Sequence, residues 1–259
     1  MFAKLLKHEF KASAGLLSVL CLTSLGVGVS GGFIIRYMAN TPAWKIDDAL
    51  GTILSILFAV MIFSLFAFAL TGWLYLCIQY YQRKFTDQGY LTFTLPVPAW
   101  QIYLSSFLNF MLWSILLGVA IVGSFMVMFL IGFFTTDFWY EIQDFWSFLD
   151  EVDLMNLMEE NVLYSILDFI NGILLVLNSI TIGSVLAKKH KVLCTIGIYY
   201  LVSILISVLS GWLSEMDYIY DFAYALRTYQ TVSILISSAF ALGGAVLSVQ
   251  LMKKKLNLT

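Results

Sequence analysis

The sequence predicts an all-α integral membrane protein with six transmembrane helices, a single domain over residues 1–259, and both termini in the cytoplasm. Composition is the first reason: 61% of the residues are apolar, 12% are charged, and the mean hydropathy is +0.89. Soluble domains contain about 25% charged residues. The apolar residues also gather into six long runs, and the basic residues fall mostly on one side of those runs.

Each apolar run is long enough to cross a bilayer, whose core of about 30 Å needs about 20 mostly apolar residues per helix. Backbone polar groups in lipid must be satisfied within the segment, so runs this apolar favour helices. The runs cover residues 14–35, 53–80, 107–134, 162–187, 192–213 and 231–251. Only residues 188–191, KKHK, separate the fourth run from the fifth, which predicts a tight helical hairpin.

Charge predicts the orientation. With the N-terminus inside, 11 of the 14 basic residues lie in inner segments, and 13 of the 16 acidic residues lie in outer ones. Cytoplasmic segments carry an excess of Lys and Arg. The partition therefore favours six spans with both ends inside, leaving only Arg36, Lys45 and Arg227 as outer basic residues.

The segment before the first run, residues 1–12, is predicted to be an interfacial helix. On a helix its apolar side chains share one face and its lysines share another: Phe2, Leu5, Leu6 and Phe10 against Lys4, Lys7 and Lys11. Such a helix lies in the headgroup layer with its lysines toward anionic lipid. A plain cytosolic tail, whose charges only set the orientation, is the alternative.

Two outer connections carry aromatic and acidic residues. Residues 135–161 form an acidic extracellular loop with eight acidic and no basic residues, and the aromatic residues within 138–149 predict an amphipathic helix on the outer interface. Its acidic face is either simply solvated or gathers cationic solutes. Residues 214–230, rich in tyrosine, predict an interfacial loop or a segment dipping partway into the membrane.

The fourth run contains the one ionisable residue within a predicted span, Asp168, followed by Asn171 and Asn178. At 100° per residue the three lie within about 80° of one another on a helix. This polar stripe is a candidate substrate path, and packing by hydrogen bonds between helices explains it equally well. In the first run, Gly28 and Gly32 have the small-xxx-small spacing of closely packed helices.

No catalytic or nucleotide-binding motif is found. The chain lacks a G-x-x-x-x-G-K-[ST] phosphate loop, H-E-x-x-H and G-x-S-x-G. Its three cysteines lie in apolar runs without metal-ligand spacing, and His8 and His190 lie among lysines. We therefore expect no metal site, no cofactor and no enzymatic activity on this chain.

The longest segment predicted to face the cytosol, residues 82–106, is predicted to be a cytosolic coupling loop. Its polar residues alternate with aromatic ones, and a proline closes the segment: Arg83, Lys84, Phe85, Asp87, Gln88, Tyr90 and Pro96. A short helix over 83–94, ended by the prolines at 96 and 98, would lie along the membrane surface. Either a cytosolic partner or the bilayer would cover its apolar side.

Two stretches resemble the membrane subunits of ABC-2-type ATP-binding-cassette transporters: residues 4–12, KLLKHEFKA, and residues 89–98, GYLTFTLPVP. The resemblance implies an interfacial helix at the N-terminus and a coupling helix, including Gly89, that contacts an ATPase subunit. It also implies a homo- or heterodimer of permease subunits with two ATPase subunits, which would bind ATP and Mg²⁺.

The predicted function is therefore the permease subunit of an ATP-driven exporter, in a cell membrane of the bacterial plasma-membrane type and without nucleic acid as a partner. A cationic or amphipathic peptide is the predicted substrate class. Two alternatives stay open: a membrane anchor or sensor that recruits a cytosolic partner without transport, and a Na⁺ or H⁺ pathway centred on Asp168.

Overall fold

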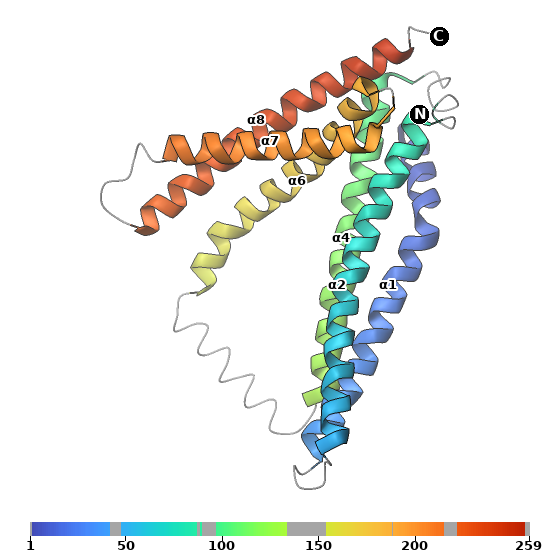
Figure 1. The fold of residues 1–259 in the computed structure, drawn as a ribbon, viewed down its shortest axis with the longest axis vertical. Coiled ribbons are helices and arrows are strands. Elements are labelled where there is room, and N and C mark those ends of the chain that lie inside the picture. Colours follow the sequence, from blue (N-terminus) through green and yellow to red (C-terminus); the bar gives the residue numbers. More distant parts are fainter. Residues whose placement is uncertain are drawn as a thin grey trace. The chain divides into compact units, whose positions relative to one another are not determined.

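The computed structural model describes residues 2–41, 48–86, 89, 97–133, 154–187, 189–214 and 222–256. Within those ranges the regular structure is entirely helical (Figure 1). The helices are α1 (Phe2–Asn40), α2 (Asp48–Phe85), α4 (Ala99–Phe133), α6 (Leu154–Leu186), α7 (Lys191–Ser214) and α8 (Phe222–Leu256). All six are long and apolar enough to cross a membrane. The prediction of an all-helical chain with six such helices is confirmed.

Four helices are much longer than a bilayer requires. α1, α2, α4 and α8 contain 39, 38, 35 and 35 residues. At about 1.5 Å per residue each exceeds 50 Å, whereas the hydrocarbon core measures about 30 Å. α2 and α4 extend beyond the predicted spans 53–80 and 107–134, because no proline or glycine interrupts residues 73–86 or 99–117. These helices therefore carry polar turns outside the hydrocarbon.

The segment predicted as a separate interfacial helix, residues 1–12, continues directly into the first span. α1 runs unbroken from Phe2 to Asn40. No proline or glycine lies within the first 14 residues, and the Ser13 hydroxyl donates to the carbonyl of Glu9 across 3.1 Å inside the helix. The lysines at positions 4, 7 and 11 remain exposed, as an amphipathic first segment requires.

The connections predicted to face outward are shorter than the sequence predicted. Residues 154–161 form the first turns of α6, and residues 222–230 form the first turns of α8. The amphipathic helix predicted over 138–149 lies outside the described residues, as do positions 215–221.

The helices form two compact units. The three-helix unit comprises residues 8–76 and 112–154, that is, most of α1, α2 and α4. The α6–α8 unit comprises residues 1–7, 77–111 and 155–259. It therefore contains α6, α7 and α8 together with the end of α2 and the start of α4, which include the two ends of the predicted coupling loop.

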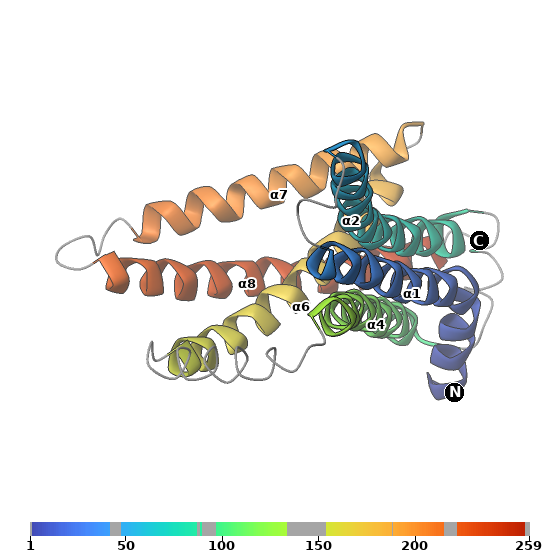
Figure 2. The same ribbon diagram turned by 90° about the horizontal axis from the view of Figure 1, so that it is seen from below.

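In the three-helix unit, α1 packs against α4 through its glycines, and the three helices run side by side (Figures 1 and 2). A Cβ atom at Gly28 would lie 2.8 Å from the Cα atom of Ser124, and one at Gly32 would lie 2.7 Å from the Cβ atom of Ile131. The predicted small-xxx-small pair is thus a contact between two helices of the same chain.

In the α6–α8 unit, α6 is the central helix. In its most apolar stretch 61% is buried, whereas the corresponding share in the other five helices is 6% to 22%. The short hairpin predicted between the fourth and fifth runs is present. A Cβ atom at Gly183 of α6 would lie 2.7 Å from the Cα atom of Thr195 of α7. The two backbones are therefore nearly in contact beside the turn.

Candidate functional site

The most connected polar group of the α6–α8 unit is the side-chain amide of Asn178, which is 3% exposed. Its Oδ1 atom accepts hydrogen bonds from the Tyr103 hydroxyl of α4 at 2.6 Å and from the Ser248 hydroxyl of α8 at 3.1 Å. Its Nδ2 atom donates to the carbonyl of Ala241 at 2.9 Å. A single amide on α6 thereby joins three helices. Within a membrane, a polar group without a hydrogen-bond partner has a high cost in free energy.

One turn further along α6, Thr181 binds the end of α2. The Tyr80 hydroxyl lies 2.8 Å from the Thr181 hydroxyl, and both residues are buried. The Thr181 hydroxyl already donates its only proton to the carbonyl of Leu177 at 2.8 Å. Tyr80 is therefore the donor in the contact between α2 and α6.

Asn171 makes a second contact between α6 and α8. Its Nδ2 atom donates to the hydroxyls of Ser237 and Ser238, at 3.1 Å and 2.9 Å. Asn171 lies seven residues before Asn178, so the two amides occupy the same side of α6, about 10 Å apart along the axis. Both amides of the predicted polar stripe thus form hydrogen bonds between helices.

Asp168, the third member of that stripe, is placed differently. Its side chain is exposed on the surface of the chain, whereas Asn171 and Asn178 are buried. Three or ten residues on a helix correspond to offsets of about 60° or 80°, which is wide enough to separate an inner from an outer face. The structure hydrogen-bonds each of the two asparagines to a neighbouring helix and leaves Asp168 exposed.

The residues predicted to contact an ATPase begin in the last turn of α2. Arg83 is half-buried, while Lys84 and Phe85 are buried at 3% and 4% exposure. The Phe85 ring packs against Tyr80 and Tyr81, with centroid distances of 6.0 and 6.5 Å. Phe85 therefore serves the packing of this helix end within the chain itself.

After α2, the chain turns back on the helix end. The Gly89 amide donates to the carbonyl of Thr86 at 2.8 Å, and a Cβ atom at Gly89 would lie 2.5 Å from the carbonyl oxygen of Lys84. Only glycine fits this approach. The remaining members of the predicted contact lie outside the described residues: Asp87, Gln88, Tyr90 and Pro96.

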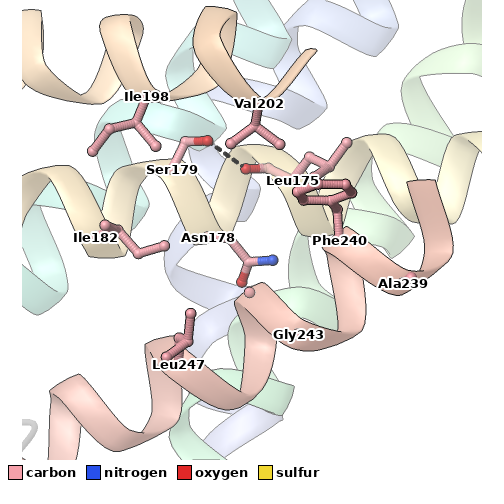
Figure 3. Close-up of a pocket in the computed structure, with 11 residues that line it drawn as sticks. Leu175, Asn178, Ser179, Ile182, Ile198, Val202, Ala239, Phe240, Gly243 and Leu247 are labelled. Atoms are coloured by element: carbon pink, nitrogen blue, oxygen red, sulfur yellow. Dashed lines mark hydrogen bonds between the residues drawn. The ribbon is translucent and has the colours of Figure 1, made fainter. Parts of the chain in front are cut away.

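An apolar cavity of about 400 Å³ borders the Asn178 network, between α6, α7 and α8. Ile198 and Val202 of α7 face Phe240 and Leu247 of α8 across it (Figure 3). The Ser179 hydroxyl, also in the wall, donates to the carbonyl of Leu175 at 2.7 Å (Figure 3). Because the polar atoms are engaged by the protein, the cavity offers an apolar surface to a ligand.

Two neighbouring glycines give this geometry a direct test. A Cβ atom at Gly244 would lie 2.6 Å from Nδ2 of Asn178, whereas a Cβ atom at Gly243, which lines the cavity, meets nothing within 4 Å. Gly243→Ala is expected to raise stability by up to about 1 kcal/mol through helix propensity. Gly244→Ala is expected to lower it by about 1–2 kcal/mol by displacing the amide. Thermal midpoints of the two purified variants check the opposite signs, and equal shifts would contradict the placement of Asn178.

The contacts between helices include residues that the sequence analysis did not single out: Tyr80, Tyr103, Thr181 and Ser248. The available signal was the presence of hydroxyl groups within apolar runs. That signal is weak, because most such hydroxyls bond to their own helix, as Ser18, Thr71 and Ser210 do here.

The fold and these contacts define the class: a multi-pass helical membrane protein with a polar network buried among its apolar helices. No family model, curated protein or solved structure matches the chain. Across the described residues no group of three His, Cys, Asp or Glu side chains is arranged to hold a metal ion. The geometry of the site itself is therefore the basis for a functional argument.

Proposed function

We propose that this chain is the transmembrane permease subunit of an ATP-driven exporter, and that a separate ATP-binding-cassette ATPase contacts it at residues 82–106. ATP and Mg²⁺ would bind to that partner, and a second permease subunit would complete the path. Both termini and the coupling loop would face the cytoplasm, as the distribution of basic residues predicts.

The observation that supports coupling is a pair of tyrosines on either side of the short helix predicted over residues 83–94. Tyr80, five residues before the end of α2, binds Thr181 of α6. Tyr103, near the start of α4, binds Asn178 of the same helix. The chain is thus hydrogen-bonded to the central helix of the unit both before and after residues 83–94. A force applied to the loop would reach α6 through both contacts, and α8 through the bonds of Asn178.

Such a linkage matters only if the partner moves the loop. Coupling requires two states whose balance the nucleotide shifts by binding one of them better. A non-transporting anchor would need the loop surface alone, and buried connections to α6 before and after residues 83–94 would add nothing to it. An ion pathway at Asp168 draws no support from the described contacts, because the asparagines predicted to share that pathway bind neighbouring helices.

The cavity between α6, α7 and α8 narrows the substrate class. Its lining residues include no carboxylate to hold a cation, and most of them are aliphatic or aromatic. Of the two classes that the sequence predicts, an amphipathic peptide therefore fits better than a purely cationic one. Its apolar side would enter the cavity from the membrane.

The coupling proposal is tested by Asp87→Ala with Tyr90→Ala in the loop. The matched control is Asp217→Ala with Tyr220→Ala, the same residue pair at the same spacing in a predicted outer connection. The wild-type protein, purified from its source under mild conditions, is expected to carry an ATPase subunit. The loop variant is expected to bind that subunit about 30-fold more weakly, because one aromatic hot spot contributes about 2 kcal/mol.

ATPase activity retained on the permease measures this loss, and the control variant is expected to match the wild type. A complex without any ATP-hydrolysing subunit would refute the proposal. So would labelling of a cysteine introduced at Thr86 by a membrane-impermeant reagent added outside intact cells, since the loop would then face away from any cytosolic partner.

A further inference from the structure

A second hollow lies where the α6–α7 turn meets the end of α2. It has a volume of about 400 Å³. Its wall is formed by one residue of α2, two of the turn and three of the first turn of α7: Tyr81, Lys189, His190, Lys191, Val192 and Leu193. All of these belong to the α6–α8 unit, so the hollow is a feature of a single compact body.

The charge of this hollow is of one sign. Lys189 and Lys191 supply ammonium groups, His190 between them supplies ring nitrogens, and the lining set contains no carboxylate. Lys189 and His190 are exposed and Lys191 is half-buried. Two cations held beside one hollow repel each other, and an anion bound between them replaces that repulsion with attraction.

The backbone adds to the same field. The carbonyl of His190 accepts the amide proton of Cys194 at 3.0 Å, so His190 is the cap of α7. The amides of the first helical turn consequently have no partner within the helix. α7 is 24 residues long, and the positive end of its dipole adjoins the lysines. The lysine pair, the helix end and the hollow thus converge on one place.

Apolar side chains at the same place identify the kind of anion. Val192 and Leu193 line the hollow beside the lysines, yet they are 60% and 67% exposed. They begin the apolar span Lys191–Leu213, and in a membrane that span would place them where the headgroup layer gives way to hydrocarbon. Tyr81 is amphipathic and is typical of that layer. A soluble anion would leave the apolar half of the hollow unused, whereas a phospholipid fills both halves.

We propose that this hollow binds the phosphate group of an anionic phospholipid, with Lys189, His190 and Lys191 around the headgroup and the acyl chains along Val192 and Leu193. Basic pockets between membrane helices are known to select anionic headgroups. The bound lipid would bridge the α6–α7 hairpin and the end of α2, next to the loop of the proposed ATPase contact. The site exists whether or not the chain couples to an ATPase.

The test compares four ligands on the purified full-length chain in a neutral detergent: phosphatidylglycerol, phosphatidylcholine with the same acyl chains, glycerol 3-phosphate and inorganic phosphate. Phosphatidylglycerol alone is expected to raise the thermal midpoint, and native mass spectrometry is expected to show it retained. Stabilisation by phosphatidylcholine to the same extent would overturn the proposal, because the charge would then be irrelevant. Equal stabilisation by either soluble phosphate would also overturn it, because the ligand would not be a lipid.

A charge-matched pair of variants locates the site. Lys189→Gln with Lys191→Gln removes two charges from the hollow, and Lys253→Gln with Lys254→Gln removes two exposed charges from the end of α8. The first variant is expected to bind phosphatidylglycerol about 30-fold more weakly, at about 1 kcal/mol for each lysine. The second is expected to bind like the wild type.

Equal weakening of phosphatidylglycerol binding in both double variants would overturn the proposal. The loss would then reflect a general attraction between surface lysines and anionic lipid. The single substitution Lys189→Gln lies at an exposed position of the turn, so this variant is expected to fold like the wild type. It is expected to show about half of the loss on a logarithmic scale. A second substitution, Leu193→Ser, is expected to weaken the binding of phosphatidylglycerol, because the acyl chains lose an apolar contact.

Discussion

Replacing Asn178 with leucine is expected to lower the free energy of unfolding by about 3 kcal/mol. Leucine has a similar volume, so packing is largely kept, but it accepts no hydrogen bond from Tyr103 or Ser248 and donates none to Ala241. The Tyr103 hydroxyl would then be buried without this acceptor, and in a membrane interior water does not replace the lost partner. The loss combines three bonds between helices with the cost of an unsatisfied donor.

Denaturation of the purified protein by a graded series of ionic detergent measures this effect. Ser179→Ala is the matched control, because among the described residues its buried hydroxyl bonds to Leu175 of the same helix and to no other helix. In a double-mutant cycle, Tyr103→Phe is expected to be destabilising in the wild type and nearly neutral in the Asn178→Leu background. Additive effects of the two substitutions would show that the hydrogen bond between Tyr103 and Asn178 does not contribute to stability.

Substituting valine for Gly28 is expected to be comparably disruptive in the three-helix unit, at up to about 3 kcal/mol for an overpacked contact. The three atoms nearest to a Cβ at this position all belong to the backbone of Ser124. A neighbouring side chain can change its rotamer to make room, but a helix backbone cannot. α1 and α4 would have to separate, which would also expose Ser124, whose side chain is fully buried.

Gly26→Val is the internal control for this prediction. The two glycines share a helix and a run of small residues, but a Cβ atom at Gly26 meets nothing within 4 Å. Gly26→Val is therefore expected to change stability by no more than about 0.5 kcal/mol, as at other surface positions. Comparison of the two midpoints in the same denaturation assay decides the matter. If Gly26→Val were less stable than Gly28→Val, the face of α1 that packs against α4 would be assigned wrongly.

The six membrane-crossing helices followed from the sequence because hydropathy is a local property. Each span could be recognised from about 20 consecutive residues without knowledge of its neighbours. The turn between α6 and α7 was predicted for the same reason, since KKHK is too short for any other connection. Helix ends were predicted less well. Residues 81–85 and 99–106 are polar enough to leave the hydrocarbon, yet nothing in them ends a helix.

The roles of Asp168, Asn171 and Asn178 show where local reasoning fails. Their spacing placed all three within one broad stripe, but a stripe 80° wide crosses the boundary between a buried and an exposed face. Which side of that boundary each residue occupies depends on where α8 and α4 pack. That information is not present within α6.

The sequence by itself therefore determined the class of this protein: an all-helical chain with six segments able to cross a membrane, together with the charge asymmetry that predicts their orientation. Only the tertiary structure decided which polar groups meet. The partners of Tyr80, Tyr103 and Ser248 lie 101, 75 and 70 residues away in the chain. The same holds for Tyr81, which α2 brings to the lysines of a distant turn. Hydrogen bonds and hollows of this kind depend on how helices pack against one another, whereas the tendency to enter a membrane depends on each helix alone.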